Sequence, residues 1–372
     1  MSTLGPGIIP RPLAQLPWKV ILLVIAIGMF GLVVLYSAAG GNLQPWASLQ
    51  GIKLFAFLAM AILLSRVPES FWALGAFPMY LVIVLMLVGV ELLGAVAGGS
   101  QRWLDLGIIR LQPSELMKPV IVLAAARFYE LLPVGEIRKF GAIWPAAVLI
   151  GVPAGLVMLQ PDLGTALMIT GCGVMVVFLA GVPLRLFIGG ALALAVSIPL
   201  AVNFLLHEYQ RNRVLTFLDP ESDPLGTGYH ISQSKIAIGS GGIFGKGFLN
   251  GTQSHLDYLP EGHTDFALAT MMEEWGLMGG LFLIIAFSLL IGWGISVSLR
   301  AKSRFGRLTA AGLSGTIFLY ASINMAMVMG LAPVVGVPLP LISFGGTAVM
   351  TIMICFGILL SIDRESRQVS RW

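Results

Sequence analysis

The stretch from His207 to Phe266 holds many of the side chains in this chain that could do acid–base or phosphate chemistry. The chain on either side is largely apolar, whereas this stretch contains every histidine and several cations: His207, His230, His255, His263, Arg211, Arg213, Lys235 and Lys246. It ends in the sequence LPEGHTDF, which places Asp265 where the chain re-enters an apolar run. A carboxylate at such a boundary is partly desolvated, and desolvation can tune it toward the working range of a general base. The alternative is an acid at the start of a helix, satisfied by backbone N–H groups and the helix dipole.

Two further acidic positions have both a chemical and a structural interpretation, and a third has a structural one. Glu273 follows Asp265 at a distance of about 12 Å along a helix, and a carboxylate at that depth is costly unless it is paired or faces a polar interior. Glu115 and Lys118 share a helix face, so they can form a structural ion pair or help to bind an anionic substrate. Asp162 directly follows a proline, and we expect it to cap the start of a helix.

Seven basic residues fall on the same predicted side of the membrane as Asp265, a side that is usually poor in Lys and Arg: Arg102, Arg110, Lys118, Arg211, Arg213, Lys235 and Lys246. Because Arg and Lys bind phosphate well, these residues are candidates for holding a phosphorylated substrate. The glycine-rich run 238–247 could add backbone N–H groups, but it lacks P-loop spacing and predicts no nucleotide site. The histidines lack close ligand spacing, so no dedicated zinc site is predicted. A divalent cation (Mg²⁺ or Mn²⁺) could screen a diphosphate near Asp265, although no motif demands one.

The composition is that of a membrane protein. Of 372 residues, 57% are hydrophobic and only 11% charged, whereas soluble domains carry about 25% charged residues. Apolar runs of about 20 residues predict an all-α, polytopic fold with about ten transmembrane helices. We place these helices near residues 19–40, 46–65, 70–92, 115–132, 141–159, 164–183, 185–206, 267–299, 307–330 and 346–363. Both cysteines, Cys172 and Cys355, fall inside apolar runs, where we expect them to pack as small hydrophobic side chains.

The distribution of basic residues predicts the orientation. If both termini are cytoplasmic, the inner side holds fourteen of the twenty-two Lys and Arg residues, as the positive-inside rule requires. The segment 207–266 is then a large extracytoplasmic loop between helices 7 and 8. The outward segments 98–119, 160–165 and 338–347 combine Pro and Gly with polar residues, which suggests broken helices around a wet cavity. We expect one integral membrane domain over residues 1–372, with these segments converging on one site.

Several long motifs in fixed order resemble the SEDS family (shape, elongation, division and sporulation). They are RVLTFLDP (213–220), GYHISQSKIAIGSGG (228–242), GTQS (251–254), LPEGHTDF (259–266) and PVVGVPLPLISFGG (333–346). The resemblance runs from about residue 17 to residue 363, and it is strongest to the elongation branch of the family rather than the division branch. Phe344 is one departure, because Tyr stands there in many members.

The resemblance implies a ten-helix peptidoglycan glycosyltransferase that polymerises lipid II on the outer face of the bacterial inner membrane during cell elongation. It places the essential aspartate of the family on Asp265, a second helix acid on Glu273, and a paired acid and lysine on Glu115 and Lys118. The remaining candidates for binding or supporting the substrate come from the motifs and the basic loops: Arg102, Arg211, Arg213, Gln233, Ser234, Lys235, Lys246, His263 and Ser343.

The chemistry of this reaction agrees with the residues. The leaving group is a polyprenyl diphosphate, which needs cationic stabilisation more than a general acid. One carboxylate that takes the proton of the acceptor hydroxyl is then sufficient, unlike the paired acids of glycosidases. An α-linked donor and a β-linked product require inversion, so we expect a single displacement with Asp265 as the base.

The resemblance also implies the partners. They are lipid II, the growing glycan strand, a class B penicillin-binding protein acting as transpeptidase, and the elongation machinery, with no role for nucleic acid. Partner binding would use the apolar surface of the eighth and ninth helices. Two alternatives remain open: a lipid II flippase, which would need acids through the full depth of the membrane, and a noncatalytic scaffold for the transpeptidase.

Overall fold

The structure is a computed structural model that describes residues 16–93, 95–97, 100–105, 110–204, 227–256, 258–259 and 261–369. Within these ranges the chain is mainly helical, with only short strands, which confirms the predicted all-α class. The helices are α2 (Trp18–Ala38), α3 (Trp46–Leu64), α4 (Glu69–Leu93), α5 (Pro113–Leu131), α6 (Phe140–Leu159), α7 (Leu163–Leu179), α8 (Leu184–Phe204), α10 (Thr227–Gly241), α11 (Thr252–His255), α12 (Ala267–Arg300), α13 (Arg304–Val328) and α14 (Gly346–Val369), with a 3₁₀ turn at Val134–Glu136. The strands are β1 (Ala95–Ala97), β2 (Ser100–Asp105) and β3 (Arg110–Leu111).

Each predicted span coincides with a helix, and α14 alone continues well past its predicted end. Seven helices of the described chain are long and apolar enough to cross a membrane: α2, α3, α4, α6, α12, α13 and α14. The helix α5 is interrupted by charged residues, and α7 and the apolar part of α8 are shorter. The chain is therefore a multi-pass membrane protein, and the count of ten crossings stays a prediction.

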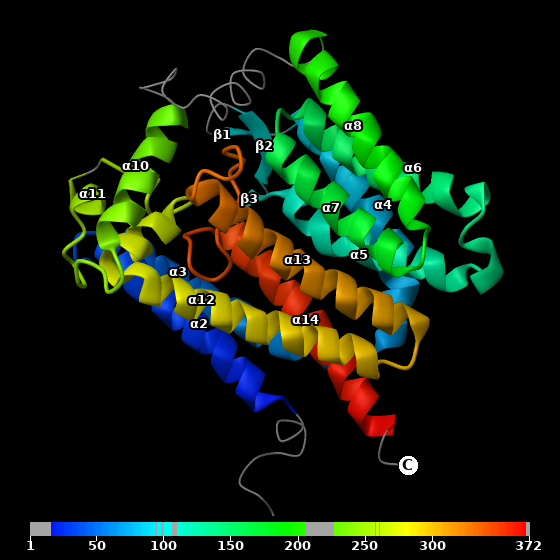
Figure 1. Cartoon of the computed structure of the whole chain (residues 1–372). Helices are drawn as coiled ribbons and strands as arrows, with labels where there is room; N and C mark the ends of the chain where they lie inside the picture. Colours follow the sequence, from blue (N-terminus) through cyan, green and yellow to red (C-terminus); the bar gives the residue numbers. More distant parts are fainter. Residues whose placement is uncertain are drawn as a thin grey trace, which may run out of the picture.

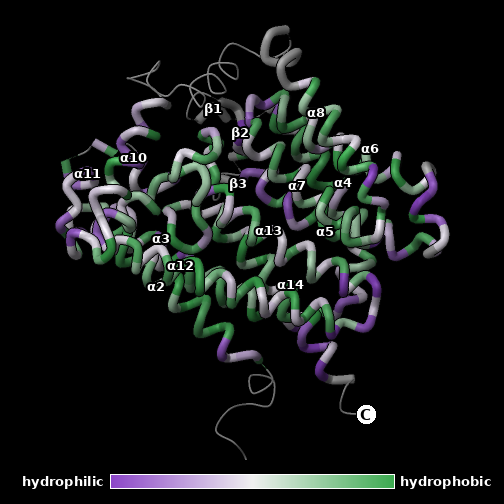
Figure 2. Tube along the Cα trace, viewed as in Figure 1, coloured by the Kyte–Doolittle hydropathy of each residue, from purple (hydrophilic) through white to green (hydrophobic). Residues whose placement is uncertain are grey.

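The helices α13 and α14 form the centre of the bundle. Their apolar spans are 61% and 78% buried, whereas that of α4 is only 22% buried. On the peripheral helices large apolar side chains such as Ile52 and Leu74 are exposed. Lipid solvates such side chains at no cost, so the outer helices carry apolar residues on both faces (Figure 2).

The packing brings segments far apart in sequence into contact. The helix α12 packs on α13, α14 on α3, and α5 on both α4 and α7. The start of α2, the turn between α12 and α13, and the C-terminal end lie on one side of the bundle in Figure 1, and the strands lie toward the other side.

Two features of the predicted loops differ from expectation. The segment expected to contain a broken helix instead forms a three-stranded antiparallel sheet in the order β1-β2-β3. The long polar loop contains α10, a fifteen-residue helix that packs on α12. Neither has a strong period in the sequence, because α10 mixes glycine and polar residues and the strands are short.

The long helix α12 is broken at Gly276, whose backbone has φ 60° and ψ −156°. A side chain there would collide with the backbone of Gly245, because its Cβ would come within 2.4 Å of that nitrogen. The segment 242–247 satisfies the backbone groups at the break: the N–H of Leu277 donates to the carbonyl of Gly242, and the N–H of Lys246 donates to the carbonyl of Glu273, each at 3.0 Å. Irregular backbone at membrane depth is thus covered by protein rather than lipid.

Candidate active site

A cavity of about 870 Å³ lies among α3, β2, the start of α5, the start of α7, the turn before α12, and the segment 336–348. Four charged candidates from four distant segments line it: Arg102, Glu115, Asp162 and Asp265. The predicted outward segments therefore converge on one cavity, and its role as the site stays a prediction.

Asp265 is held by its backbone and by its neighbours. The side-chain amide of Asn324 on α13 donates to the carbonyl of Asp265 at 2.9 Å and to the carbonyl of Val337 at 2.7 Å. On the other side, a Cβ added at Gly336 (φ +69°) would lie 3.5 Å from the Asp265 Oδ2 atom. The carboxylate of Asp265 therefore faces Gly336 in the segment that precedes α14.

Glu115 and Lys118 form the predicted ion pair, with 2.5 Å between Lys118 Nζ and Glu115 Oε1. The Lys118 ammonium also donates to the hydroxyl of Tyr320 at 2.7 Å, and that hydroxyl donates to Glu115. All three side chains are buried, and Glu115 faces the cavity. This triad ties α5 to α13 and gives Glu115 a fixed position in the cavity wall. A buried cation that is already neutralised in this way is less able to neutralise a ligand.

Arg102 on β2 is bound to the start of α7. It donates to the carbonyls of Gln160 and Pro161 at 3.3 and 2.6 Å, and its guanidinium lies 3.5 Å from Asp162 Oδ2. Asp162 accepts the N–H of Thr165 at 3.1 Å, which confirms that it caps α7. Arg102 therefore docks the sheet onto the helix bundle at the rim of the cavity.

Glu273 is fully buried but is not part of the cavity lining. Its carboxylate accepts hydrogen bonds from the ammonium of Lys246 at 2.7 Å and from the N–H groups of Thr252 and Gln253 at 2.8 and 2.9 Å. Glu273 and Lys246 therefore lie outside this cavity, and their role in binding or supporting the substrate stays a prediction. Together they form a clamp that holds the segment 246–254 against α12.

The glycine-rich run offers no free phosphate cradle at Gly245, Lys246 and Gly247. The N–H groups of these residues donate to the carbonyls of Gly241, Glu273 and Glu274. Two of these N–H groups bind carbonyls next to the break in α12 and the third binds within the run, so none of the three is available to a phosphate.

Three candidates on α10 and one before α14 also lie away from the cavity lining. The Ser234 hydroxyl donates to the carbonyl of Val328 at 2.7 Å, which fixes α10 to the end of α13. Gln233 is half-buried on the same helix, and the Lys235 stem packs at Gly330, where an added Cβ would lie 2.2 Å from Lys235 Cε. Ser343 accepts the N–H of Leu339 at 2.9 Å and closes the turn that precedes α14.

His263 stacks on Trp46, with ring centroids 3.9 Å apart and planes inclined by 10°. Its carbonyl accepts the N–H of Phe344 at 2.8 Å. Burial lowers the pKa of His263, and the charge of Glu261 opposes that change. The neutral imidazole thus packs as an aromatic ring next to the turn that carries Asp265.

Some candidates cannot be placed. His207, Arg211 and Arg213 lie outside the described residues, as does the side chain of Arg110. Within the described ranges no group of three or more His, Cys, Asp or Glu residues is placed to hold a metal ion. Both cysteines are buried and free.

Two lining or supporting residues were not predicted. Lys53 on α3 lines the cavity, and its Nζ lies 4.6 Å from the centre of the Phe344 ring. Asn324 supports Asp265 from within α13. Both are polar residues inside apolar runs, and such a residue inside a membrane span is itself a signal of function.

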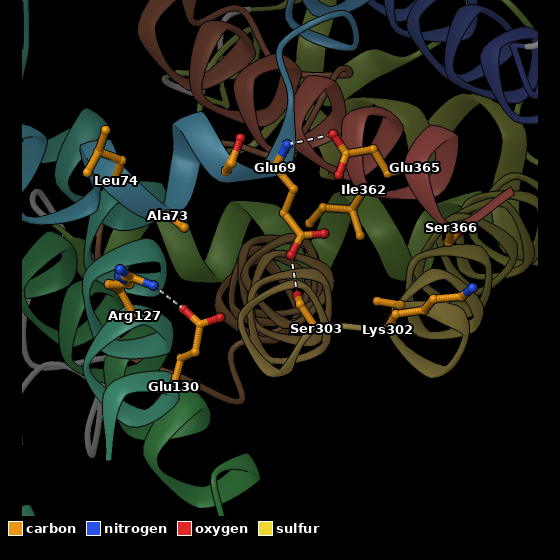
Figure 3. Close-up of a pocket in the computed structure, with 12 residues that line it drawn as sticks. Glu69, Ala73, Leu74, Arg127, Glu130, Lys302, Ser303, Ile362, Glu365 and Ser366 are labelled. Atoms are coloured by element: carbon orange, nitrogen blue, oxygen red, sulfur yellow. Dashed lines mark hydrogen bonds and ion pairs between the residues drawn. The ribbon is translucent and has the colours of Figure 1, made fainter. Parts of the chain in front are cut away.

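A second cavity of about 600 Å³ lies near the other end of α5, between the start of α4, the α12–α13 turn and α14 (Figure 3). Glu365 accepts the N–H of Glu69 at 2.9 Å at the start of α4. Glu69 in turn accepts from the Ser303 hydroxyl, which also accepts the N–H of Gly306 at 2.7 Å. Glu365 therefore caps α4, and Glu69 supports Ser303, which caps α13. In the described chain the linings of the two cavities share no residue.

Known proteins resemble this chain over nearly all of its length. The peptidoglycan glycosyltransferase MrdB of Escherichia coli is 44% identical over 353 residues, which is 94% of each chain. The probable peptidoglycan glycosyltransferase FtsW of Legionella pneumophila is 38% identical over 332 residues, covering 87% of this chain and 83% of that relative.

Solved structures agree with these relatives. One is a chain from a peptidoglycan synthase complex, with a TM-score of 0.82, 32% identity, and coverage of 95% of this chain and 99% of the other. Another is the rod shape determining protein RodA of Thermus thermophilus, with a TM-score of 0.71, 28% identity, and coverage of 94% and 97%. The FtsW/RodA/SpoVE family model, described as cell cycle protein, matches residues 17–368. The chain therefore belongs to the FtsW/RodA/SpoVE family, which is the SEDS family that its motifs resemble.

Proposed function

We propose that this chain is a peptidoglycan glycosyltransferase that polymerises lipid II into glycan strands during cell elongation. The observation that carries the proposal is the position of Asp265, which lines one large cavity together with Glu115 and Arg102 directly before the apolar helix α12. The relatives named as peptidoglycan glycosyltransferases support the same activity.

In the proposed reaction Asp265 is the general base. Its carboxylate takes the proton of the acceptor sugar hydroxyl while that oxygen forms a bond to the anomeric carbon of the donor. The bond from this carbon to the diphosphate oxygen breaks, and the polyprenyl diphosphate leaves with the electron pair. A single displacement inverts the anomeric configuration. The carboxylate is positioned for this role because Asn324 fixes its backbone and Gly336 leaves room beside its Oδ2 atom.

We further propose that the cavity faces the outside of the inner membrane and that both termini are cytoplasmic. The basic cluster around Lys302 lies at the other end of the bundle, as the positive-inside rule requires of a cytoplasmic turn. A cysteine placed at residue 302 should react with a membrane-impermeant maleimide only in permeabilised cells. A cysteine placed at residue 101 should react with it already in intact cells. The reverse pattern would overturn the orientation.

A transpeptidase partner of the class B penicillin-binding type is proposed as well. The similar chain in a solved peptidoglycan synthase complex supports it. The exposed apolar side chains of α12, such as Ile284, Ile285 and Leu289, offer a surface for a transmembrane helix. Replacing Ile285 by Arg should lower co-purification of the partner, and unchanged recovery would count against this surface.

The structure favours an enzyme over a flippase. A flippase needs a polar route between the two cavities, but the part of α5 between them, Val120–Ala126, is apolar and buried. Purified protein given labelled lipid II, in the absence of other glycosyltransferases, should form polymer. If it forms none even with the transpeptidase present, but moves lipid II across proteoliposomes, transport would replace polymerisation as the function.

A further inference from the structure

We propose that Lys53 forms an anion subsite in the cavity, between α3 and the start of α14, and that it binds an anionic oxygen of the substrate. The identity of that substrate rests on the proposed glycosyltransferase function. The subsite itself rests on the geometry and the charge of the cavity.

Lys53 is the only charged residue of α3, a helix that is otherwise suited to lipid. It lies seven residues after the first residue of the helix, which is about 10 Å of helix length. A lysine at such a depth is costly unless it reaches the interface or faces a polar cavity. The Lys53 ammonium lies over the Phe344 ring at 4.6 Å from its centre, and the residue lines the cavity. Its charge is therefore directed into the protein.

The charge of Lys53 has no carboxylate partner within ion-pair distance in the described part of the chain. The other described cation of the lining, Arg102, is occupied by Asp162 and two backbone carbonyls. Lys118 nearby is neutralised by Glu115. The aromatic ring beside Lys53 compensates only part of its charge, so an anionic ligand would complete its environment.

The start of α14 adds positive potential at the same place. Gly345, Gly346, Thr347 and Ala348 line the cavity, and a Cβ added at Gly346 would lie 3.2 Å from Lys53 Nζ. The N-terminal end of a helix carries about half a positive charge. A lysine at that end is repelled by the helix unless an anion lies between them, and the two together attract that anion.

In the proposed reaction two kinds of anion qualify: the diphosphate of the polyprenyl-linked donor and the carboxylates of its peptide stem. Both present oxygens that a lysine ammonium can bind. Asp265 lines the same cavity, so either group would be held in the compartment that contains the base.

The test is binding of undecaprenyl diphosphate to the full-length protein purified in detergent. We expect Lys53→Met and Lys53→Gln to weaken binding by about 10- to 100-fold, because each removes a charged hydrogen-bond donor. Lys53→Arg should bind almost as well as the wild type. Lys302→Met is the matched control, since it removes an exposed lysine from the other cavity, and it should leave binding unchanged.

A soluble muramyl pentapeptide without phosphate distinguishes the two anions. If its binding depends on Lys53 and that of undecaprenyl diphosphate does not, the subsite holds a carboxylate. Equal affinity of wild type and both neutral variants for both probes would overturn the subsite. Binding of the probes needs no bond formation, so it can be measured even if the protein makes no polymer. Lys53-dependent binding by such a protein would overturn only the proposed function. If the protein does polymerise lipid II, and Lys53→Met and Lys53→Gln leave both the KM for lipid II and the affinity for the probes unchanged, only the subsite would be overturned.

Discussion

Asn324 uses one amide nitrogen to hold two segments that meet at the candidate base. Its Nδ2 atom donates to the carbonyls of Asp265 and Val337, and the residue is completely buried. Replacing Asn324 by Leu leaves both carbonyls with one donor fewer in a buried place, at about 1–3 kcal/mol each. We therefore predict a lower Tm and a lower kcat for polymerisation, with a smaller change in KM. Ser322→Ala on the same helix, where the hydroxyl bonds only to α13 carbonyls, is the control. Wild-type Tm and kcat in Asn324→Leu would show that Asp265 needs no such support.

His263 predicts a pH dependence of stability. Burial lowers its pKa in the folded protein below the ordinary value of about 6.5. At pH values between the folded and the unfolded pKa, the unfolded chain binds a proton that the folded chain does not. The stability that comes from keeping His263 neutral is therefore fully present above about pH 6.5 and is lost as the pH falls through the folded pKa. We expect Tm to decrease on acidification from pH 7 and His263→Gln to decrease less steeply. Parallel Tm profiles for the two proteins would contradict this role.

At the scale of elements, the clamp between Glu273 and Lys246 holds the segment 246–254 on α12. Glu273 is fully buried and accepts several hydrogen bonds, whereas Lys246 is 26% exposed. We expect Lys246→Met to lower the free energy of unfolding by about 1–3 kcal/mol. Glu273→Gln should therefore destabilise the protein more than Lys246→Met. The two changes should be non-additive, because they share one interaction. Thermal unfolding with limited proteolysis of the segment measures both effects, and a larger loss in Lys246→Met would refute the assignment.

Local signals in the sequence predicted a large part of the molecule. Apolar runs located the helices, the three-residue spacing located the Glu115–Lys118 pair, and the proline before Asp162 indicated a helix start. Each of these features is decided by residues close together in the chain.

Long-range features were not predictable in the same way. The spacing of Glu273 gave no sign that its partners would come from the segment 246–254, and α10 shows no clear period. The sequence marks Lys53 and Asn324 only as polar residues inside apolar runs, and their contacts with Phe344, Asp265 and Val337 form only when α3, α13 and the segment before α14 come together. Tertiary contacts made these residues part of the site.

At the scale of the whole molecule, the bundle has two different ends. One end contains the cavity lined by Asp265 and Lys53, and the other contains a network in which Glu365 caps α4, Ser303 caps α13 and Glu69 binds the Ser303 hydroxyl. Buried apolar residues of α5 separate the two. This arrangement suits an enzyme that works at one membrane surface and anchors its helices at the other.

The most direct measurement compares lipid II polymerisation by the purified wild type and Asp265→Asn. The substitution keeps the shape of the side chain and the backbone carbonyl that Asn324 binds, so Tm should change little, while loss of the base should abolish polymer formation. Asp162→Asn, which alters another acid of the same cavity, should keep measurable activity. Polymer formation by folded Asp265→Asn at a rate close to that of the wild type would contradict the assignment of Asp265 as the base.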